Sequence, residues 1–529
     1  VSIAELREKH FAPFKAAIEA GALSIMVNSA SINGIPTHAD YELLTVWLKE
    51  GLNWDGMIVT DWADIANLYT REKIAVDHKD AIRLSINAGV DMSMIPYDVN
   101  FCTLLIELVN EGKVSMERID DAVRRIIRMK VRLGLLDTPN TYRKDYPKFQ
   151  GEEIREACYK TATESITLLK NNDQILPLSP DTRILVAGPN ADRMRPLCGG
   201  WSFSWQGDIV DQVLPNGTTF VDAIRAIGGD NVDFVAGVEY ASKGHFAAEC
   251  NIDIEAAVKA AENAEVVVLC IGENSYCEAP GNITEMAISE NQQQLAKALI
   301  ATGKPVVLVL NEGRGRIISS FVDNTAAVLH TYIPGTEGAR ALADILYGKV
   351  NPSGKLPYTY QKYSNAMTTY DHKASESVDT MEGAYDYNAV VSAQWAFGYG
   401  LSYTTFEYSN LRVIEGQEFK AGDTIRIAVD VKNIGKRSGK ESVLLFINDD
   451  VASIVPDARR LRDFEKVEIA AGESTTVEFE IRAEELAMAA NDGKWHLEEG
   501  TFTIQCGNLT DRLTCTETTH LGPNIRLNR

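Results

Sequence analysis

The sequence lacks the features that mark several large classes of protein. No apolar run in its 529 residues reaches the roughly 18–20 positions that a membrane-spanning helix needs. Lys and Arg number 52 against 74 Asp and Glu, so the formal charge is −22. Such an excess of negative charge repels phosphate backbones and anionic lipid surfaces. We therefore expect no nucleic-acid partner and no membrane span.

Motifs for metals, nucleotides and serine nucleophiles are also missing. There is no HExxH or Cys/His spacing typical of zinc, no glycine-rich phosphate loop and no GxSxG elbow. The eight cysteines contain no CxxC pair and are too sparse for a disulfide scaffold, although Cys506 and Cys515 are close enough for a single hairpin disulfide. These absences leave carboxylates and aromatic side chains in loops as the candidates for function.

The first 137 residues alternate between helical and strand patterns. The patterns predict parallel strands near 24–28, 57–60 and 90–95, with right-handed crossover helices between them. Three such units cannot close a barrel, because a (β/α)₈ barrel takes about 250 residues. We interpret residues 1–140 as the C-terminal part of a (β/α)₈ barrel. We also expect a missing N-terminal barrel segment, from the same protein or from a separate chain.

The rest of the chain divides by the period of its apolar residues. Residues 150–372 begin with a predicted helix at 155–169 and continue with five apolar strand runs separated by helices, which is typical of an α/β sandwich domain. From about 400 the period becomes two, which predicts a β-sandwich over 396–529. The fold class is therefore multidomain α/β with a β-sandwich at the C-terminal side.

Two acidic residues directly follow apolar strand runs. Asp61 ends the run 57–60 and precedes Trp62, at the end of a barrel strand where barrel enzymes carry their reactive groups. Glu273 lies just after the apolar run 266–271, at the edge where open α/β sheets bind ligands. The alternative interpretations are that Asp61 caps the following helix and that Glu273 is a solvated loop acid.

A third candidate is the glycine-rich loop around Trp201 and Trp205. Two indoles in a polar loop suit a carbohydrate platform, because the apolar face of a sugar gains from stacking on a flat ring. The alternative is packing of the loop against a neighbouring domain.

Several segments together resemble glycoside hydrolase family 3, of the β-glucosidase and exo-glucanase type. The longest is NGIPTHADYELLTVWLKEGLNWDGMIVTDWADI at 33–65. The others include CGGWSFSWQGD at 198–208, VLCIGEN at 268–274, NPSGKLPYTY at 351–360 and FGYGLSYTTFEY at 397–408. The resemblance extends over nearly the whole chain and implies that the C-terminal β-sandwich is fibronectin III-like.

The resemblance implies a retaining β-glycosidase that needs no metal and no organic cofactor. It assigns the nucleophile to Asp61 and the acid/base to Glu273, with the two carboxyl groups about 5–5.5 Å apart. Glu273 must hold a proton, which burial against Trp201 or Trp205 favours. Glu278 and Glu290 lie downstream and are the alternatives for the acid/base role.

The resemblance also implies residues that bind the sugar. Trp62 and Trp201 are expected to flank the leaving-group sugar, and Trp205 belongs to the same aromatic loop. Met26 and Ser29 fall in the segment that forms another subsite wall, and Ser29 stands where many relatives carry an aromatic residue.

The expected activity is exo-acting release of glucose from the non-reducing end of β-glucans or oligosaccharides. The alternative within this class is a β-xylosidase or another exo-glycosidase, and the alternative from another class is a non-catalytic carbohydrate-binding protein. The expected partners are a small-molecule carbohydrate and the missing barrel segment, with a homodimer left open. The resemblance implies a secreted or periplasmic location.

Overall fold

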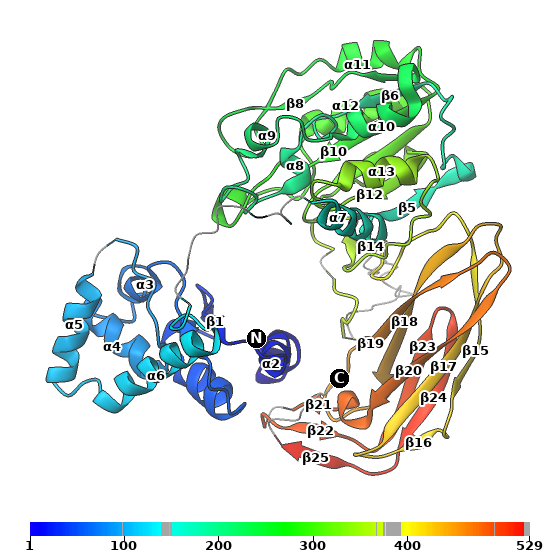
Figure 1. Ribbon diagram of the computed structural model, residues 1–529. Coiled ribbons are helices and arrows are strands. Elements are labelled where there is room, and N and C mark those ends of the chain that lie inside the picture. The colour runs from blue at the N-terminus through cyan, green and yellow to red at the C-terminus, as the bar shows by residue number, and fades with distance from the viewer. Residues whose placement is uncertain are drawn as a thin grey trace, which may run out of the picture.

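The computed structural model describes residues 1–522 apart from 98, 139–145, 147, 149, 150, 367, 374, 375, 377–392 and 491. Three bodies follow one another along the chain: a helix-rich N-terminal part, an α/β domain and a β-sandwich (Figure 1). The predicted boundaries at 140 and 150 lie outside the described residues, and those near 372 and 396 stay predictions.

The N-terminal part is built around a short parallel sheet. Strand β1 (Ser24–Met26) pairs in parallel with β4 (Met57–Val59), and Val59 forms a parallel bridge to Met92. Helices cover these strands, as expected of consecutive barrel units. The remaining elements are α1 (Ile3–Glu5), η1 (Leu6–Phe11), α2 (Ala12–Glu19), β2 (Ser31–Ile32), β3 (Ile35–Pro36), η2 (Thr37–Ala39), η3 (Glu42–Glu50), α3 (Asp64–Thr70), α4 (His78–Ala88), α5 (Asn100–Asn110) and α6 (Met116–Arg132).

The strand predicted at 90–95 is reduced to that single bridge. The carboxylate of Asp91 accepts a hydrogen bond from the backbone N–H of Ile58 at 2.8 Å, and the N–H groups of Asp91 and Met92 both donate to the carbonyl of Ile58. The carboxylate of Asp91 also forms ion pairs with Nζ of Lys49 at 2.8 Å and with the guanidinium of Arg118. A side chain therefore takes a bond that a strand ladder would have made with backbone.

The α/β domain contains a sheet in the order β5-β12-β11-β10-β6-β7, with apolar clusters on both faces. All neighbours are parallel except β5, which runs antiparallel to β12 at one edge. The strands are β5 (Thr167–Asn171), β6 (Ile184–Ala187), β7 (Val232–Phe234), β10 (Val266–Gly272), β11 (Val306–Asn311) and β12 (Ala327–His330). The helices are α7 (Glu152–Ser165), α8 (Arg195–Cys198), α9 (Val210–Val213), α10 (Phe220–Gly228), α11 (Ile254–Ala261), α12 (Glu290–Ala301) and α13 (Gly338–Leu346).

The helix predicted to run to Leu169 ends instead at Ser165. Leu168 and Leu169 belong to β5, where both side chains are buried, one against each face of the sheet. An apolar run at the end of a helix is compatible with a longer helix or with a strand. Here residues 167–171 form a strand because they pair with the edge of β12. Short elements complete the domain: η4 (Asn172–Gln174), η5 (Gly229–Asn231), β8 (Glu239–Tyr240), β9 (Glu249–Cys250), η6 (Ala279–Gly281), η7 (Val322–Asn324), β13 (Tyr360–Gln361) and β14 (Ala393–Trp395).

The C-terminal part is a β-sandwich whose inner residues alternate as predicted. In β17 the side chains of Ile425, Ile427, Val429 and Val431 are buried in one apolar cluster. The sheets run β15-β17-β20 and β16-β24-β23-β18-β19, beside a smaller sheet β21-β22-β25. The strands are β15 (Phe406–Val413), β16 (Glu418–Phe419), β17 (Thr424–Asn433), β18 (Gly439–Asp449), β19 (Arg460–Ile469), β20 (Ser474–Arg482), β21 (Met488–Ala489), β22 (Trp495–Leu497), β23 (Gly500–Cys506), β24 (Leu509–Cys515) and β25 (Thr519–Gly522), with η9 (Ala483–Leu486) between β20 and β21.

The hairpin disulfide considered for Cys506 and Cys515 does not form. All eight cysteines lie in the described part of the chain and are free thiols. In the β23–β24 ladder Cys506 is opposite Leu509 and Cys515 is opposite Gly500, so the two thiols are not partners. Both pack in the sandwich core instead.

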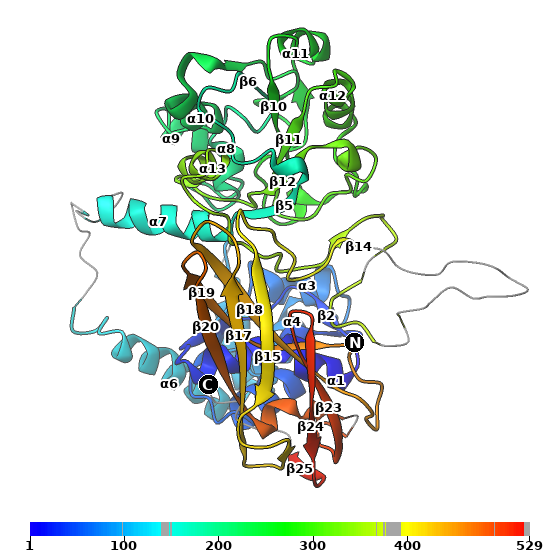
Figure 2. The same cartoon turned by 90° about the vertical axis from the view of Figure 1, so that its right-hand side faces the viewer.

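The sandwich touches both other bodies. Glu8 of η1 accepts from Arg460 at 2.8 Å and from the backbone N–H of Ala489. Glu164 of α7 pairs with Lys440 at 2.6 Å and with Lys466. Figure 2 shows the sandwich in front of the N-terminal part and below the α/β domain. Among the described residues, no helix is long and apolar enough to cross a membrane.

Candidate active site

Asp61 lies just beyond the carboxyl end of β4. Its Oδ1 accepts from the backbone N–H of Trp62 at 2.6 Å, and its own N–H donates to Nε2 of His38 at 3.4 Å. Helix α3 begins after Ala63, which is the N-cap residue with φ 57° and no side-chain cap. Asp61 is therefore not the helix cap considered from the sequence, and its second carboxylate oxygen is left for other contacts.

His38 is a buried neighbour of Asp61 that the sequence reasoning missed. Its Nδ1 lies 3.8 Å from the carboxylate of Asp64, which in turn accepts from Asn67. Burial lowers the pKa of His38, and the nearby carboxylates Asp64 and Asp61 oppose that shift. Because Nε2 accepts a hydrogen bond from the backbone N–H of Asp61, the ring proton of neutral His38 lies on Nδ1 and faces Asp64. The arrangement fixes the backbone that carries Asp61.

Trp62 is a surface indole beside that carboxylate. It is 57% exposed and donates from Nε1 to the hydroxyl of Tyr97 at 3.1 Å, with the two rings edge to face at 6.2 Å. The hydrogen bond holds the indole while its face stays open. Trp62 and Tyr97 thus form an aromatic surface next to Asp61.

Met26 and Ser29 occupy different surroundings. The hydroxyl of Ser29 receives a guanidinium hydrogen bond from Arg71 at 3.0 Å. Met26 ends β1 and lines an apolar cavity of about 360 Å³ together with Ile25 and Phe14. Ser29 is thus in a polar setting, whereas Met26 belongs to an apolar surface at the edge of the sheet.

Glu273 follows β10 and is buried in a set of hydrogen bonds, with a side chain only 2% exposed. Its Oε1 accepts from Arg314 at 2.9 Å and Arg316 at 2.7 Å, and its Oε2 accepts from the hydroxyl of Tyr276 at 2.8 Å. The sequence reasoning expected an indole beside this carboxylate, but two guanidinium groups and a phenol take that place. Arg314, Arg316 and Tyr276 therefore bond to both carboxylate oxygens of Glu273.

Glu278 lies five residues further on and is exposed. Its backbone has φ 52° and ψ −145°, a conformation that residues with a side chain adopt at a cost and that recurs at functional sites. Its carboxylate accepts a hydrogen bond from the thiol of Cys277 at 3.7 Å. The third acid considered, Glu290, is in the first turn of α12 and accepts from Gln294, which suits a helix-dipole role.

The aromatic loop lies beside the segment that carries Glu278. Trp201 and Trp205 are 69% and 46% exposed, and the backbone N–H of Trp201 donates to the backbone carbonyl of Trp205 at 2.9 Å. The side-chain amide of Gln206 forms two hydrogen bonds of 3.0 Å with the backbone of Cys277. The structure therefore brings Trp201, Trp205 and Glu278 together on two linked loops of the α/β domain.

The predicted residues thus fall into two groups on two bodies. Asp61 and Trp62 bond to residues of the N-terminal part, whereas Glu273 bonds to residues of the α/β domain. The separation of about 5–5.5 Å between the two catalytic carboxyl groups stays a prediction. The arginines were missed because they lie some forty positions beyond Glu273, although the charged run after β11 was a visible signal.

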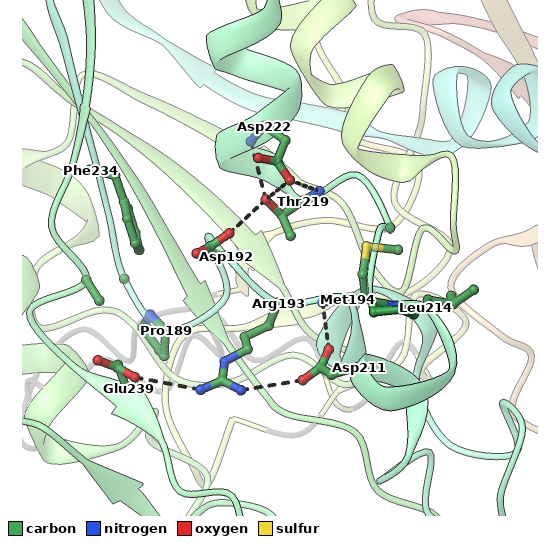
Figure 3. A pocket seen from close by; sticks show the side chains of 14 residues that line it. Pro189, Asp192, Arg193, Met194, Asp211, Leu214, Thr219, Asp222, Phe234 and Glu239 are labelled. Carbon is green, nitrogen blue, oxygen red and sulfur yellow. Dashed lines mark hydrogen bonds and ion pairs between the residues drawn. The ribbon is translucent and has the colours of Figure 1, made fainter.

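A further cavity of the α/β domain contains none of the predicted residues. It measures about 430 Å³ and lies near the carboxyl ends of β6 and β7. Arg193 reaches Asp211 at 3.5 Å and Glu239 at 3.7 Å, while Thr219 bonds Asp192 on another wall (Figure 3). Its charged side chains all bond to other residues of the lining, so we do not include it in the candidate site.

A smaller cavity of about 220 Å³ lies directly at Glu273. Its lining includes Glu312, which accepts from Tyr360 at 2.6 Å. Burial raises the pKa of Glu312 to about 8. Within the described residues no group of three His, Cys, Asp or Glu side chains is arranged to hold a metal ion.

Family models match most of the chain. Residues 1–129 match the glycosyl hydrolase family 3 N terminal domain, residues 166–403 match the family's C-terminal domain, and residues 441–510 match a fibronectin type III-like domain. A lysosomal beta glucosidase of Dictyostelium discoideum is 40% identical, with 92% of this chain and 60% of that protein covered. A beta-xylosidase of Formosa agariphila is 32% identical, over 95% of this chain and 70% of that one. This chain belongs to glycosyl hydrolase family 3.

Other comparisons agree on the family and on the fold. A periplasmic beta-glucosidase of Salmonella typhimurium is 32% identical, over 96% of this chain and 69% of that protein. The crystal structure of a beta-glucosidase from Listeria innocua in complex with glucose aligns with a TM-score of 0.87 and 28% identity, over 98% of this chain and 70% of that one. The family 3 chain therefore spans 60 to 70% of the length of these relatives.

Proposed function

We propose that this protein is a retaining, exo-acting β-glycosidase that releases glucose from the non-reducing end of β-glucans or oligosaccharides. The observation that carries the proposal is Asp61 at the end of a barrel strand, where its backbone N–H donates to His38 and its carboxylate accepts from the backbone N–H of Trp62. In the retaining mechanism Asp61 attacks the anomeric carbon and forms a glycosyl-enzyme, and the leaving oxygen departs with a proton from the acid/base.

We propose Glu278 as that acid/base, in place of the predicted Glu273. A residue in this role must hold a proton, release it to the leaving oxygen and then take one from water. Glu278 is exposed and has free acceptor capacity. Glu273 is buried, with Arg314, Arg316 and Tyr276 bonded to its two oxygens. The contacts of Glu273 favour a structural role beneath the loop that carries Glu278.

The open indoles support a carbohydrate substrate. Trp62 on one body and Trp201 on the other each present an exposed ring beside a proposed catalytic carboxylate. Stacking of sugar faces on these rings would select a neutral ligand, which also suits a chain of charge −22. Trp205, Met26 and Ser29 are proposed as further contacts of the same substrate.

A β-xylosidase is the second candidate, because a beta-xylosidase is among the similar proteins. Xylose lacks the hydroxymethyl group of glucose, so the two sugars are distinguished by the wall facing that group. Comparing kcat/KM for nitrophenyl β-glucoside and nitrophenyl β-xyloside decides between them. A protein that bound both without hydrolysis would instead be a carbohydrate-binding module.

We also propose that further barrel strands pair with β1, from another segment of the protein or from a separate chain. Among the described residues, β1 has β4 as its partner on one side, and Ile25 and Met26 line an apolar cavity beside it. Within the described part of the chain the other side of β1 is therefore an unpaired strand edge, and a closed barrel has no such edge. An intact mass above that of the 529 residues, or a second polypeptide in the purified enzyme, is the expected result. A second copy of the chain, as a homodimer, is the other outcome.

We propose a secreted or periplasmic location, which is supported by the similarity to a periplasmic beta-glucosidase of Salmonella typhimurium. Fractionation of the source cells tests it.

Covalent labelling tests the proposed activity. A 2-deoxy-2-fluoro β-glucoside with an activated leaving group slows the second step, so a retaining enzyme accumulates the glycosyl-enzyme. We expect the label on the peptide that contains Asp61, and β-glucose as the first product in NMR of an unlabelled turnover. A label on another carboxylate, or α-glucose as the first product, would contradict the proposal.

A further inference from the structure

The segment from Tyr276 to Gly281 carries Glu278, and one side chain holds it at both ends. Arg314 donates from Nη2 to the carbonyl of Gly281 at 2.7 Å, and its guanidinium lies 4.3 Å from the ring centroid of Tyr276. The N–H of Gly281 in turn donates to the carbonyl of Glu278 at 2.8 Å. Two successive hydrogen bonds therefore connect Arg314 to the peptide of Glu278.

The guanidinium itself is fixed from below. Arg314 Nε donates to Oε1 of Glu273 at 2.9 Å, and Tyr276 donates to Oε2 of the same carboxylate at 2.8 Å. Phe246 also packs against Tyr276, with ring centroids 4.7 Å apart, and its ring centroid lies 5.9 Å from the guanidinium of Arg314. The planar fork of an arginine can form both hydrogen bonds and the ring contact at once, which the single charge of a lysine cannot.

The second arginine on Glu273 serves a different segment. Arg316 donates to the carbonyls of Glu285, Met286 and Ala287, all beyond Gly281. Arg314 is therefore the guanidinium whose backbone contact lies within the segment 276–281. At Gly281 an added Cβ would lie 2.2 Å from the ring of Tyr276, so this end of the segment is packed against the stacked ring.

We infer that Arg314 is a positioning residue for the acid/base: through Gly281 and Tyr276 it holds Glu278 where its carboxyl meets the leaving oxygen. The inference rests on the proposed role of Glu278. Arg314 makes no contact with substrate in this role, and its effect passes entirely through the segment 276–281. Displacing an acid by about 1 Å can cost about 10²-fold in rate.

The test is the dependence of kcat/KM on the leaving group in the full enzyme. Arg314→Met should lower kcat/KM for a β-linked glucose disaccharide by about 10- to 100-fold, because that substrate needs a placed acid. The value for 2,4-dinitrophenyl β-glucoside should stay within about 3-fold, because that leaving group departs without a proton. Arg314→Lys should restore little, since it supplies charge without the fork.

Arg340→Met is the matched control. Arg340 also lies over a tyrosine, Tyr159, at 3.8 Å and pairs with a glutamate in the same domain, but far along the chain from the segment 276–281. This substitution should change kcat/KM for either substrate by no more than about 2-fold, because it breaks a partly exposed ion pair away from the site. Thermal melts of all variants report any loss of the fold.

The results separate the inference from the function on which it rests. Equal loss on both substrates in Arg314→Met, or no loss on the disaccharide, would overturn the positioning role. If Glu278→Ala shows the leaving-group split and Arg314→Met does not, the inference alone fails. If Glu278→Ala shows no split, the proposed acid/base fails, and the positioning role falls with it.

Discussion

The side-chain amide of Gln206 pairs with the backbone of Cys277 through two hydrogen bonds. Nε2 donates to the carbonyl and the N–H of Cys277 donates to Oε1, both at 3.0 Å. The pair joins the loop that presents Trp201 and Trp205 to the residue just before Glu278. A sugar stacked on the aromatic loop is therefore bound to a surface whose position relative to Glu278 is fixed.

Replacing Gln206 should weaken both stability and substrate binding. Gln206→Ala leaves two backbone groups without partners, and the expected cost is about 1–3 kcal/mol of unfolding free energy. Urea denaturation measures this cost, and KM for disaccharides should rise in parallel. Gln206→Glu keeps the hydrogen bond from the Cys277 N–H and loses the other. Its stability and its KM should therefore lie between those of the wild type and those of Gln206→Ala. Wild-type stability in Gln206→Ala would contradict the linkage.

Trp201→Ala should affect long substrates more than short ones. Stacking on the second sugar binds the ground state and the transition state alike, so its loss raises KM for oligosaccharides with little change in kcat. Steady-state kinetics with an oligosaccharide and with an aryl glucoside measure the difference, with Trp205→Ala as the comparison. Equal loss on both substrates would make Trp201 a structural residue.

Azide rescue should separate the two glutamates. In Glu278→Ala the glycosyl-enzyme should form from nitrophenyl glucoside and then accumulate, because no general base activates the water that hydrolyses it. Azide needs no base and should restore turnover, with β-glucosyl azide as the product after two inversions. Glu273→Ala should instead lower the melting temperature and show no rescue. The reverse pattern would return the acid/base role to Glu273.

Glu312 should make the stability of the protein depend on pH. Its folded pKa of about 8 lies above the ordinary value of 4.5, chiefly because of burial. The folded state therefore binds a proton between these values that the unfolded state has lost, and stability falls as pH rises through this window, by at most about 1.4 kcal/mol per unit. Glu312→Gln removes the titration. In thermal melts from pH 5 to 9, the stability of the variant relative to the wild type should increase up to about pH 8. The same pH dependence of stability in both proteins would contradict this prediction.

Asp91→Ala should destabilise the N-terminal part strongly. The buried carboxylate compensates Lys49 and Arg118 and also pairs the N–H of Ile58, so its removal should cost about 3–5 kcal/mol. Asp55→Ala breaks an exposed pair with Arg132 in the same part and should cost no more than about 1 kcal/mol. Urea denaturation of both variants measures the contrast, and equal costs would contradict the role given to Asp91.

Apolar periodicity was enough to predict the elements that bury a whole face. The runs that became β10 and β11 are apolar at nearly every position, as strands covered on both faces must be, and α12 begins at the Ser289 cap. The prediction failed where a distant partner decided the structure. Asp91 took a backbone bond from the strand expected at 90–95, and β12 drew Leu168 out of the predicted helix.

The same limit applied to the candidate site. Asp61 and the aromatic residues stood out because their types are unusual beside a strand or in a glycine-rich loop. The surroundings of Glu273 could not be predicted, because Arg314 and Arg316 reach it only through the pairing of β10 with β11. A position at the end of a strand therefore drew attention to an acidic residue, but its burial and its partners were needed to judge its role.

The contacts of Glu8 and Glu164 have a consequence for how the reaction can be lost. The proposed nucleophile and acid/base are carried by different bodies, and the β-sandwich is ion-paired to both of them. We expect these ion pairs to restrain the two bodies relative to each other, although the sandwich contributes neither reactive group. Substitutions at Arg460, whose pair with Glu8 is largely buried, are therefore expected to disturb this restraint more than substitutions at Lys440, whose pair with Glu164 is partly exposed.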